Sequence, residues 1–220
     1  DVSDRYCGLV ERPSAPTTQP TVSPTTIRVY TSSHNDPAES NCVISLEYDN
    51  DVPDNFMQNC QILQSVSLSE TVTSVGSFAF SNSTVEWVSF PISLVYIGSN
   101  AFDTTSLTEI TFRSNISIGP YAFANNWMLT RVTGSLVSVA EYAFTNSSSL
   151  SIIPTLSNAI LFDGVFGNTN VTSITLDNCI LTDGSMNNTI LSDIIIINEL
   201  LCDNIYVYSP NLHIRIIDMT

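Results

Sequence analysis

The side chains that could support catalysis are few and far apart in the sequence. Nucleophilic catalysis needs a base beside the nucleophile, and the two histidines of the chain are His34 and His213. No G-x-S-x-G, H-E-x-x-H or phosphate-loop motif accompanies them. The sequence therefore predicts a protein that is not an enzyme and holds no cofactor. A polysaccharide-active β-helix enzyme is the least favoured alternative, because it would need acidic pairs on one face.

Carboxylates are concentrated in one short segment, at Glu47, Asp49, Asp51 and Asp54. Oxygen ligands at this density suit calcium. Their spacing does not follow the EF-hand pattern, however, and the glycine and final glutamate of that loop are missing. We therefore assign no metal site. The four residues stay a weak calcium candidate beside the alternative of a solvated acidic loop.

The cysteines and sequons indicate a secreted protein. The chain has five cysteines without a C-x-x-C pair, so disulfides are favoured over a structural zinc site. Asn-x-Ser/Thr sequons begin at Asn82, Asn115, Asn146, Asn170 and Asn187. Composition alone accounts for their number, but the cysteines and the charge-poor surface independently suggest an extracellular location, secreted or at the cell surface. We therefore predict N-glycosylation of these asparagines.

The overall composition excludes two classes of partner. Charged residues are 12% of the 220 residues, and the net charge is -15 at pH 7. Nucleic acids and anionic membranes are bound by clustered Lys and Arg, whereas this chain has six Arg and no Lys. The longest aliphatic run, Ile194 to Ile197, is far shorter than the roughly 18 residues of a membrane span. Neither nucleic-acid binding nor a membrane span is expected.

A repeat organises most of the chain. Its aromatic marker recurs 22, 21, 21 and 22 residues apart, at Phe80, Phe102, Phe123, Phe144 and Phe166. An L-x-x-L-x-L pattern recurs with the same period. This predicts a mainly-β solenoid of about seven coils, in which the Phe side chains form one buried stack. Each coil then contributes one parallel strand and, on the opposite side, a short 3₁₀ turn, with an Asn two residues after the Phe making the return.

The chain divides into three predicted parts. Residues 1–26 are rich in Pro and Thr, which is typical of an extended arm. Residues 27–56 do not repeat and form an N-terminal cap, with short strands expected at 27–30 and 43–48. Residues 57–220 form the solenoid.

The repeat places two columns of side chains on the outer side of the strands. With the aliphatic residues inward, these columns contain Trp87, Glu109 and Arg131, and Thr111, Thr133 and Thr175. Glu109 and Arg131 are expected to pair across adjacent strands. Trp87 is the best single binding candidate, because an exposed Trp can stack on a sugar or anchor a protein partner. The alternative is that Trp87 packs over a neighbouring coil.

The repeat unit resembles a known family. The segment TSLTEITFRSNISIGPYAF, residues 105–123, is very similar to the unit of the BspA-like leucine-rich repeats, and the resemblance covers roughly residues 55–200. It implies an extracellular adhesive or surface protein that binds through its strand-bearing face and is not an enzyme. The sequence departs from the family in lacking Lys and in losing the Phe after Phe166, where Met186 takes its place.

The position of the cysteines in the repeat suggests their pairing. Cys179 and Cys202 occupy the end of the strand region in neighbouring coils, which predicts a disulfide between them. Cys42 and Cys60 would then join the cap to the first coil. Cys7 would be a free thiol or an intermolecular link.

The favoured function is head-to-tail self-assembly into an extracellular filament or surface polymer, that is, a homo-polymer. An apolar strand at 212–217 is expected to leave an open edge at one end of the solenoid. The arm would lie against another subunit and supply the other half of a contact that does not close. The alternative is a monomeric adhesin or receptor-like protein that binds a protein or glycan through its strand-bearing face.

Overall fold

The computed structural model describes the backbone of residues 28–31, 44–48, 51–182, 184–187, 189–202 and 212–217. Side chains are described for residues 51–182, 184–187, 189–198 and 212–217. The predicted arm, with Cys7, and half of the predicted cap lie outside these residues. His34, Cys42 and Asp49 lie outside them as well.

The described chain consists of short strands joined by turns, and no helix occurs in it. The strands are β1 (Arg28–Thr31), β2 (Ile44–Tyr48), β3 (Leu63–Leu68), β4 (Ser74–Val75), β5 (Trp87–Ser89), β6 (Tyr96–Ile97), β7 (Glu109–Ile118), β8 (Arg131–Val139), β9 (Leu156–Ser157), β10 (Ile160–Leu161), β11 (Ser173–Leu181), β12 (Asp193–Cys202) and β13 (His213–Ile217). The strands expected at 27–30, 43–48 and 212–217 are therefore present.

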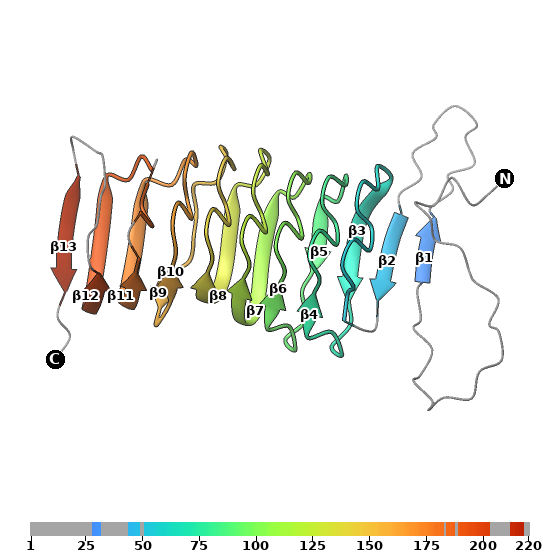
Figure 1. Cartoon of the computed structure of the whole chain (residues 1–220), viewed down its shortest axis with the longest axis horizontal. Helices are drawn as coiled ribbons and strands as arrows, with labels where there is room; N and C mark the ends of the chain where they lie inside the picture. The colour runs from blue at the N-terminus through green and yellow to red at the C-terminus, as the bar shows by residue number, and fades with distance from the viewer. Residues whose placement is uncertain are drawn as a thin grey trace.

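The strands form two sheets that follow one another along a solenoid (Figure 1). The first has the order β1-β2-β3-β5, and the second has the order β13-β12-β11-β10-β8-β7-β6-β4, with β9 paired to β11. All strand pairs are parallel except β1 with β2. This confirms the mainly-β solenoid of about seven coils, because consecutive coils each add a parallel strand to the array.

The parallel array extends into the segment predicted as a cap. Strand β2 pairs in parallel with β3, and the turn that follows β2 stacks on the next coil. In that turn the Val52 N–H donates to the Ser74 carbonyl at 3.0 Å, and the Met57 N–H donates to the Ala79 carbonyl at 2.6 Å. Met57 is buried at the position that Phe80 occupies one coil later. The described residues 44–48 and 51–60 therefore belong to the stacked array of the solenoid.

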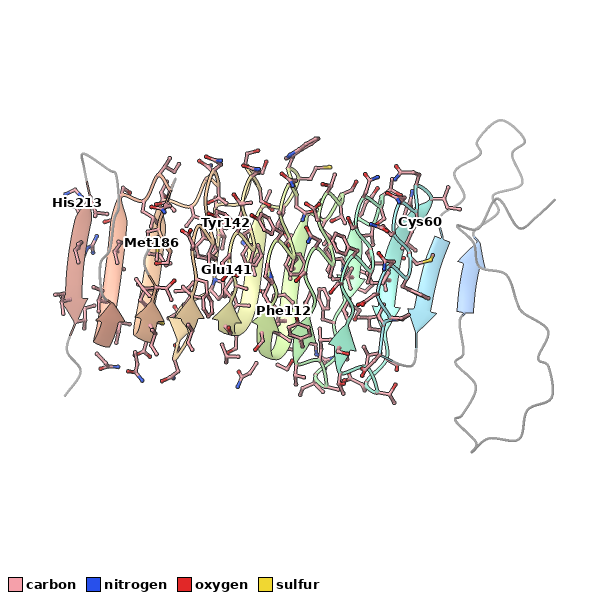
Figure 2. The ribbon with its side chains drawn as sticks, viewed as in Figure 1. Cys60, Phe112, Glu141, Tyr142, Met186 and His213 are labelled. Atoms are coloured by element: carbon pink, nitrogen blue, oxygen red, sulfur yellow. The ribbon has the colours of Figure 1, made fainter. Side chains whose placement is uncertain are left out.

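The predicted Phe stack is confirmed. Phe80, Phe102, Phe123, Phe144 and Phe166 are buried, and neighbouring rings are stacked with centroids 5.1, 5.2, 5.5 and 5.8 Å apart. Met186 continues the series as a buried residue, near the C-terminal end of the array, with Cys60 near the other end (Figure 2). The stack runs along the solenoid and fixes the relative position of the coils.

The predicted 3₁₀ turns are not present in the described residues, which form irregular turns instead. Each turn contains two residues at positive φ, four positions apart, and a 3₁₀ run needs negative φ throughout. The first of each pair is Asn55, Phe78, Asn100, Tyr121, Tyr142 or Gly164, and the second is Asn59, Asn82, Thr104, Asn125, Asn146 or Asn168. The expected role of Asn two residues after Phe is therefore confirmed, because Asn tolerates this conformation.

These asparagines also bond to one another along the solenoid. The Nδ2 of Asn168 donates to Oδ1 of Asn146 at 2.9 Å, and Asn146 in turn donates to Asn125 at 3.0 Å. Asn125 donates to Oδ1 of Asp103 at 2.8 Å. The side-chain amides thus form a ladder that holds the turns of four consecutive coils together.

Candidate functional site on the strand-bearing face

The outward columns are arranged as the repeat predicted. In the first column, the strand register pairs Ser65 with Trp87, Glu109 with Arg131, Arg131 with Ile152 and Ser173 with Asp193. In the second column, it pairs Ser67 with Ser89, Thr111 with Thr133 and Thr175 with Ile195. Neighbouring positions along a column are separated by the spacing of paired strands, about 4.8 Å. The second column therefore consists mostly of hydroxyl side chains, whereas the first contains larger and charged residues, among them Trp87.

Trp87 stands at an interruption of this face. Strand β5, which carries Trp87, ends the first sheet, whereas β7 belongs to the second. No backbone ladder joins β5 to β7 within the described chain. The same two coils are joined instead by the β6–β7 ladder and by the Ser106 N–H, which donates to the Val85 carbonyl at 3.1 Å.

Two buried aromatic residues and a proline lie at this interruption. Phe90 and Phe112 occupy the same inward position in neighbouring coils, and their ring centroids lie 5.1 Å apart. Pro91 follows Phe90 and has no N–H to continue a ladder. On the other side of Phe112 lies Gly134, where a Cβ would overlap the carbonyl oxygen of Phe112. The chain therefore packs closely around Phe112 where β7 meets β8.

A hollow of about 250 Å³ lies at this junction, and we call it the Trp87 hollow. It is lined by Trp87, Val88, Ser89, Phe90, Thr108, Glu109, Thr111 and Arg113. Trp87 is 54% exposed, so about half of its surface is open to solvent. The hollow combines two aromatic rings, three hydroxyl groups, one carboxylate and one guanidinium, which is the composition of a polar ligand site with an apolar wall.

The expected pairing of Glu109 with Arg131 is only partly realised. The two residues are register partners, but no ion pair joins them in the described part of the structure. Both side chains are exposed, so little energy would be gained by fixing them in one geometry. The Glu109 carboxylate accepts no hydrogen bond from another described residue, and it remains available at the edge of the hollow.

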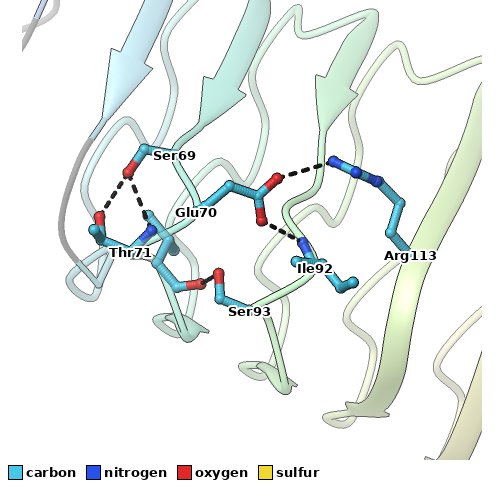
Figure 3. Close-up of polar contacts among 7 residues, drawn as sticks. Ser69, Glu70, Thr71, Ile92, Ser93 and Arg113 are labelled. Atoms are coloured by element: carbon cyan, nitrogen blue, oxygen red, sulfur yellow. Dashed lines mark hydrogen bonds and ion pairs between the residues drawn. The ribbon is translucent and has the colours of Figure 1, made fainter.

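Arg113 is held in place instead, by Glu70 from two coils away (Figure 3). Its Nη1 donates to Oε1 of Glu70 at 2.9 Å, and the Ile92 N–H donates to Oε2 of Glu70 at 2.8 Å. Both side chains of the ion pair are more than half exposed, so the pair adds at most about 1 kcal/mol to stability. Its effect is to restrain the guanidinium of Arg113, which lines the hollow.

The second column contributes hydroxyl groups. The Thr133 hydroxyl donates to Oγ1 of Thr111 at 3.0 Å, which orients Thr111 at the edge of the hollow. Thr175 belongs to the same column but lies beside Ile195, several coils from Trp87. The structure thus brings Trp87, Glu109 and Thr111 together, with Arg131 and Thr133 on the next strand, and places Thr175 elsewhere.

Arg113 and Glu70 were not among the residues selected from the sequence. They are 43 positions apart, which is about two periods of the repeat. The repeat could therefore have indicated that the two residues lie near each other. Arg113, however, lies beyond the two outward columns, where β7 shifts register between Thr111 and Asn115. An irregularity of this kind is not visible in the apolar pattern.

In the acidic segment, the described carboxylates of Asp51 and Asp54 accept hydrogen bonds from the backbone of the next coil. Asp51 Oδ1 accepts hydrogen bonds from the N–H groups of Thr73 and Ser74 at 2.7 and 2.8 Å, and Asp54 accepts one from the Ser77 N–H at 2.6 Å. Burial raises the pKa of Asp51, but these hydrogen bonds outweigh it and lower the pKa overall. Asp51 therefore stabilises the fold above its unfolded pKa, and this contribution is lost as the pH falls through the lowered value. No group of three possible metal ligands is found among the described residues, which exclude the side chains of Glu47 and Asp49.

The predicted disulfide between Cys179 and Cys202 is wrong. Cys179 is a buried free thiol whose Sγ donates to the Leu156 carbonyl at 3.0 Å. A register shift after Asp177 places Cys179 opposite Leu200, so that Cys202 lies opposite Leu181, two residues further on. With strand geometry this separates the two Cα atoms by about 8 Å, too far for a disulfide. Burial also raises the pKa of the Cys179 thiol.

Cys60 is disulfide-bonded, and it is buried at the N-terminal end of the array. Its partner lies outside the described side chains. The pairing of Cys42 with Cys60 and the role of Cys7 therefore stay predictions.

The five sequon asparagines are all exposed, but their side-chain amides differ. The Nδ2 groups of Asn82, Asn146 and Asn187 donate to Asn59, Asn125 and Asp163. Asn115 and Asn170 make no side-chain hydrogen bond to another described residue. Their glycosylation stays a prediction.

The turn-bearing face carries an aromatic pair that the sequence analysis did not select. The rings of Tyr121 and Tyr142 stack with centroids 5.2 Å apart. The Tyr142 hydroxyl donates to Asp163 at 3.1 Å, and this hydrogen bond raises the pKa of Tyr142. Gly164, at φ +58°, leaves room for the Tyr142 ring, which a Cβ would approach to 2.5 Å. This pair is fixed by contacts within the chain and does not border a hollow.

Comparison with known proteins supports the repeat assignment. The model of the BspA type leucine rich repeat region matches residues 50–157 and 131–213, with six copies. Among solved structures, a leucine-rich repeat protein of T. pallidum is 17% identical in sequence and has a TM-score of 0.39. The alignment covers 64% of this chain and 86% of the T. pallidum chain. A leucine-rich repeat protein from Bacteroides ovatus is 16% identical in sequence and has a TM-score of 0.37. The alignment covers 86% of this chain and 68% of the B. ovatus chain.

No curated protein matches the sequence. The described residues include no helix with the length and apolar character needed to cross a membrane. The family model spans well over half of the chain, and the coils that it matches are those of the observed solenoid. The chain belongs to the BspA type leucine-rich repeat family.

Proposed function

We propose that this repeat protein is an extracellular binding protein that holds its ligand on the strand-bearing face, at the Trp87 hollow. The observation that carries the proposal is the hollow itself, which lies where no ladder joins β5 to β7 and is lined by an exposed Trp, hydroxyl groups and two charged groups. Elsewhere the face consists mostly of short side chains. Exposed Trp and Arg residues are typical of the few positions that supply most of the binding energy at an interface.

The extracellular location rests on three observations. Members of this repeat family are typically secreted or at the cell surface. Cys60 is disulfide-bonded, and structural disulfides persist in oxidising compartments. The sequon asparagines are exposed, as glycosylation requires.

A binding role suits the hollow better than catalysis. Glu109 is the only carboxylate that lines it, whereas hydrolysis of a glycosidic bond commonly uses two carboxyl groups. His213 is exposed on β13, at the C-terminal end of the array (Figure 2), far from Trp87. We therefore propose a non-enzymatic protein.

Replacing Trp87 should abolish ligand retention. We expect Trp87→Ala to reduce binding of the labelled protein to cells of the encoding organism about tenfold or more, because a central aromatic anchor is lost. Trp127→Ala is the matched control, since Trp127 is 65% exposed and does not line the hollow. Equal retention of both variants and the wild type would contradict the proposal.

Head-to-tail assembly is a second proposed function, favoured by the surface of β13. Ile214 and Ile216 are register partners of Ile194 and Ile196, which are 1% and 8% exposed, yet they are themselves 53% and 72% exposed. Apolar side chains at core positions of a solenoid are stable when another coil covers them. We propose that the first coil of a second copy does so, with the arm at 1–26 contributing to the contact, which would give an open polymer.

Sedimentation at increasing protein concentration tests this second function. The wild type should form larger species, and Ile216→Asp should remain a monomer, because a buried carboxylate at the contact is costly. Ile190→Asp is the control, since Ile190 is also exposed, at 52%, but lies outside β13. A wild type that sediments as a monomer at every concentration would contradict assembly and leave the binding proposal as the sole function.

A further inference from the structure

We infer that the Trp87 hollow binds a single neutral pyranose ring, such as a hexose unit of a surface glycan. This inference rests on the proposed binding function and names the chemical class of its ligand. The size of the hollow, the chemistry of its lining and the charge around it each support this assignment.

The hollow has room for one ring. Its volume is about 250 Å³, just below the roughly 300–1,000 Å³ of pockets that enclose a drug-sized ligand. It is open along the face, so further units of an oligosaccharide could extend over the neighbouring strands. A folded peptide segment would need a larger or deeper site.

The lining has two kinds of surface, as a pyranose does. The exposed face of Trp87 offers an apolar, aromatic wall for the C–H face of a sugar. Around it, Ser89, Thr108 and Thr111 carry hydroxyl groups that can both donate and accept hydrogen bonds. Sugar hydroxyls have the same double capacity, so each can be satisfied in the hollow.

Two charged groups are placed to fix the orientation of the sugar. The Glu109 carboxylate has no partner among the described residues, and it can accept hydrogen bonds from two adjacent hydroxyls. The Arg113 guanidinium has five N–H donors, of which the bond to Glu70 uses one (Figure 3). Glu70 holds Arg113 from the side, so the remaining donors are oriented before a ligand arrives.

The charge favours a neutral sugar over an acidic one. The chain carries a net charge of -15, which repels anions over the whole surface. Within the hollow, Glu109 would lie close to the carboxylate of a uronic acid. The guanidinium of Arg113 is already balanced by Glu70.

Fluorescence of a single tryptophan tests the inference. The chain has two Trp residues, so Trp127→Phe leaves Trp87 as the only reporter. We expect methyl hexopyranosides and neutral oligosaccharides to change the Trp87 emission with saturation. Glu109→Gln in the same background should weaken the affinity about tenfold or more. The reciprocal Trp87→Phe variant reports from Trp127 and should show no change.

Three other outcomes would overturn the inference. One is a saturable change that also appears in Trp87→Phe, which places sugar binding elsewhere. Another is a stronger response to uronic acids than to neutral sugars. The third is no response of Trp87 to any saccharide of a broad panel. If cell retention still depends on Trp87 in that last case, the proposed binding function stands and the ligand is of another class.

Discussion

Phe123→Ala should lower the free energy of unfolding by about 3–5 kcal/mol. Phe123 is fully buried between Phe102 and Phe144, with ring centroids 5.2 and 5.5 Å away, and it meets the edge of Phe112 at 6.1 Å. Removing the ring leaves a cavity in the middle of the array, which neighbouring coils cannot fill without losing their own contacts. Urea denaturation followed by circular dichroism gives this value directly.

A matched control for Phe123→Ala is Trp127→Ala. Trp127 is also aromatic and lies only four residues away, but it is mostly exposed, so its removal should change stability by less than about 1 kcal/mol. If both variants unfold at the same urea concentration as the wild type, the Phe stack does not hold the coils together.

Gly134→Ala should destabilise the protein by about 3 kcal/mol, although it adds a single methyl group. Gly134 has φ +106°, a conformation that side chains strongly disfavour. A Cβ there would overlap the Phe112 carbonyl oxygen and lie 2.8 Å from the Phe112 Cβ. The strain cannot relax easily, because the obstructing atoms belong to the backbone of β7 and the start of its side chain. Thermal unfolding compared with the wild type measures the loss.

Gly167→Ala provides the contrast for Gly134→Ala. Gly167 does not have a positive φ, and the nearest atoms to its added Cβ would lie 3.3 Å away. Its cost should therefore be well below that of Gly134→Ala. Equal melting temperatures for Gly134→Ala and the wild type would show that β8 does not pack against β7 as closely as described.

The regular features of the molecule were predictable from the sequence because one period governs them. The spacing of Phe80 and its equivalents specified the buried stack, and the alternation within each strand specified which side chains face outward. Trp87 could be selected for the same reason, since the alternation places its large aromatic side chain on the outer side of the strand. These inferences depend on distances along one coil, which the repeat fixes.

The irregular features were not predictable because they depend on contacts between particular coils. The hollow at Trp87 lies where no ladder joins β5 to β7, and the apolar pattern continues through both strands without a sign of this break. The disulfide prediction failed because a local register shift after Asp177 moves Cys202 away from Cys179. Asn178, at φ +52°, lies within that shift. An Asn recurs at the same place in three coils, at Asn158, Asn178 and Asn198, and this recurrence was the signal that could have indicated the shift.

Site-specific photo-crosslinking tests most directly whether the strand-bearing face binds the ligand. A benzophenone side chain is introduced at Thr108, which is exposed and lines the Trp87 hollow, or at Tyr121, which is exposed on the turn-bearing face. After irradiation on cells of the encoding organism, crosslinked surface material should be recovered from position 108 and not from position 121. Crosslinks that form at position 121 and are absent at position 108 would contradict binding through the strand-bearing face.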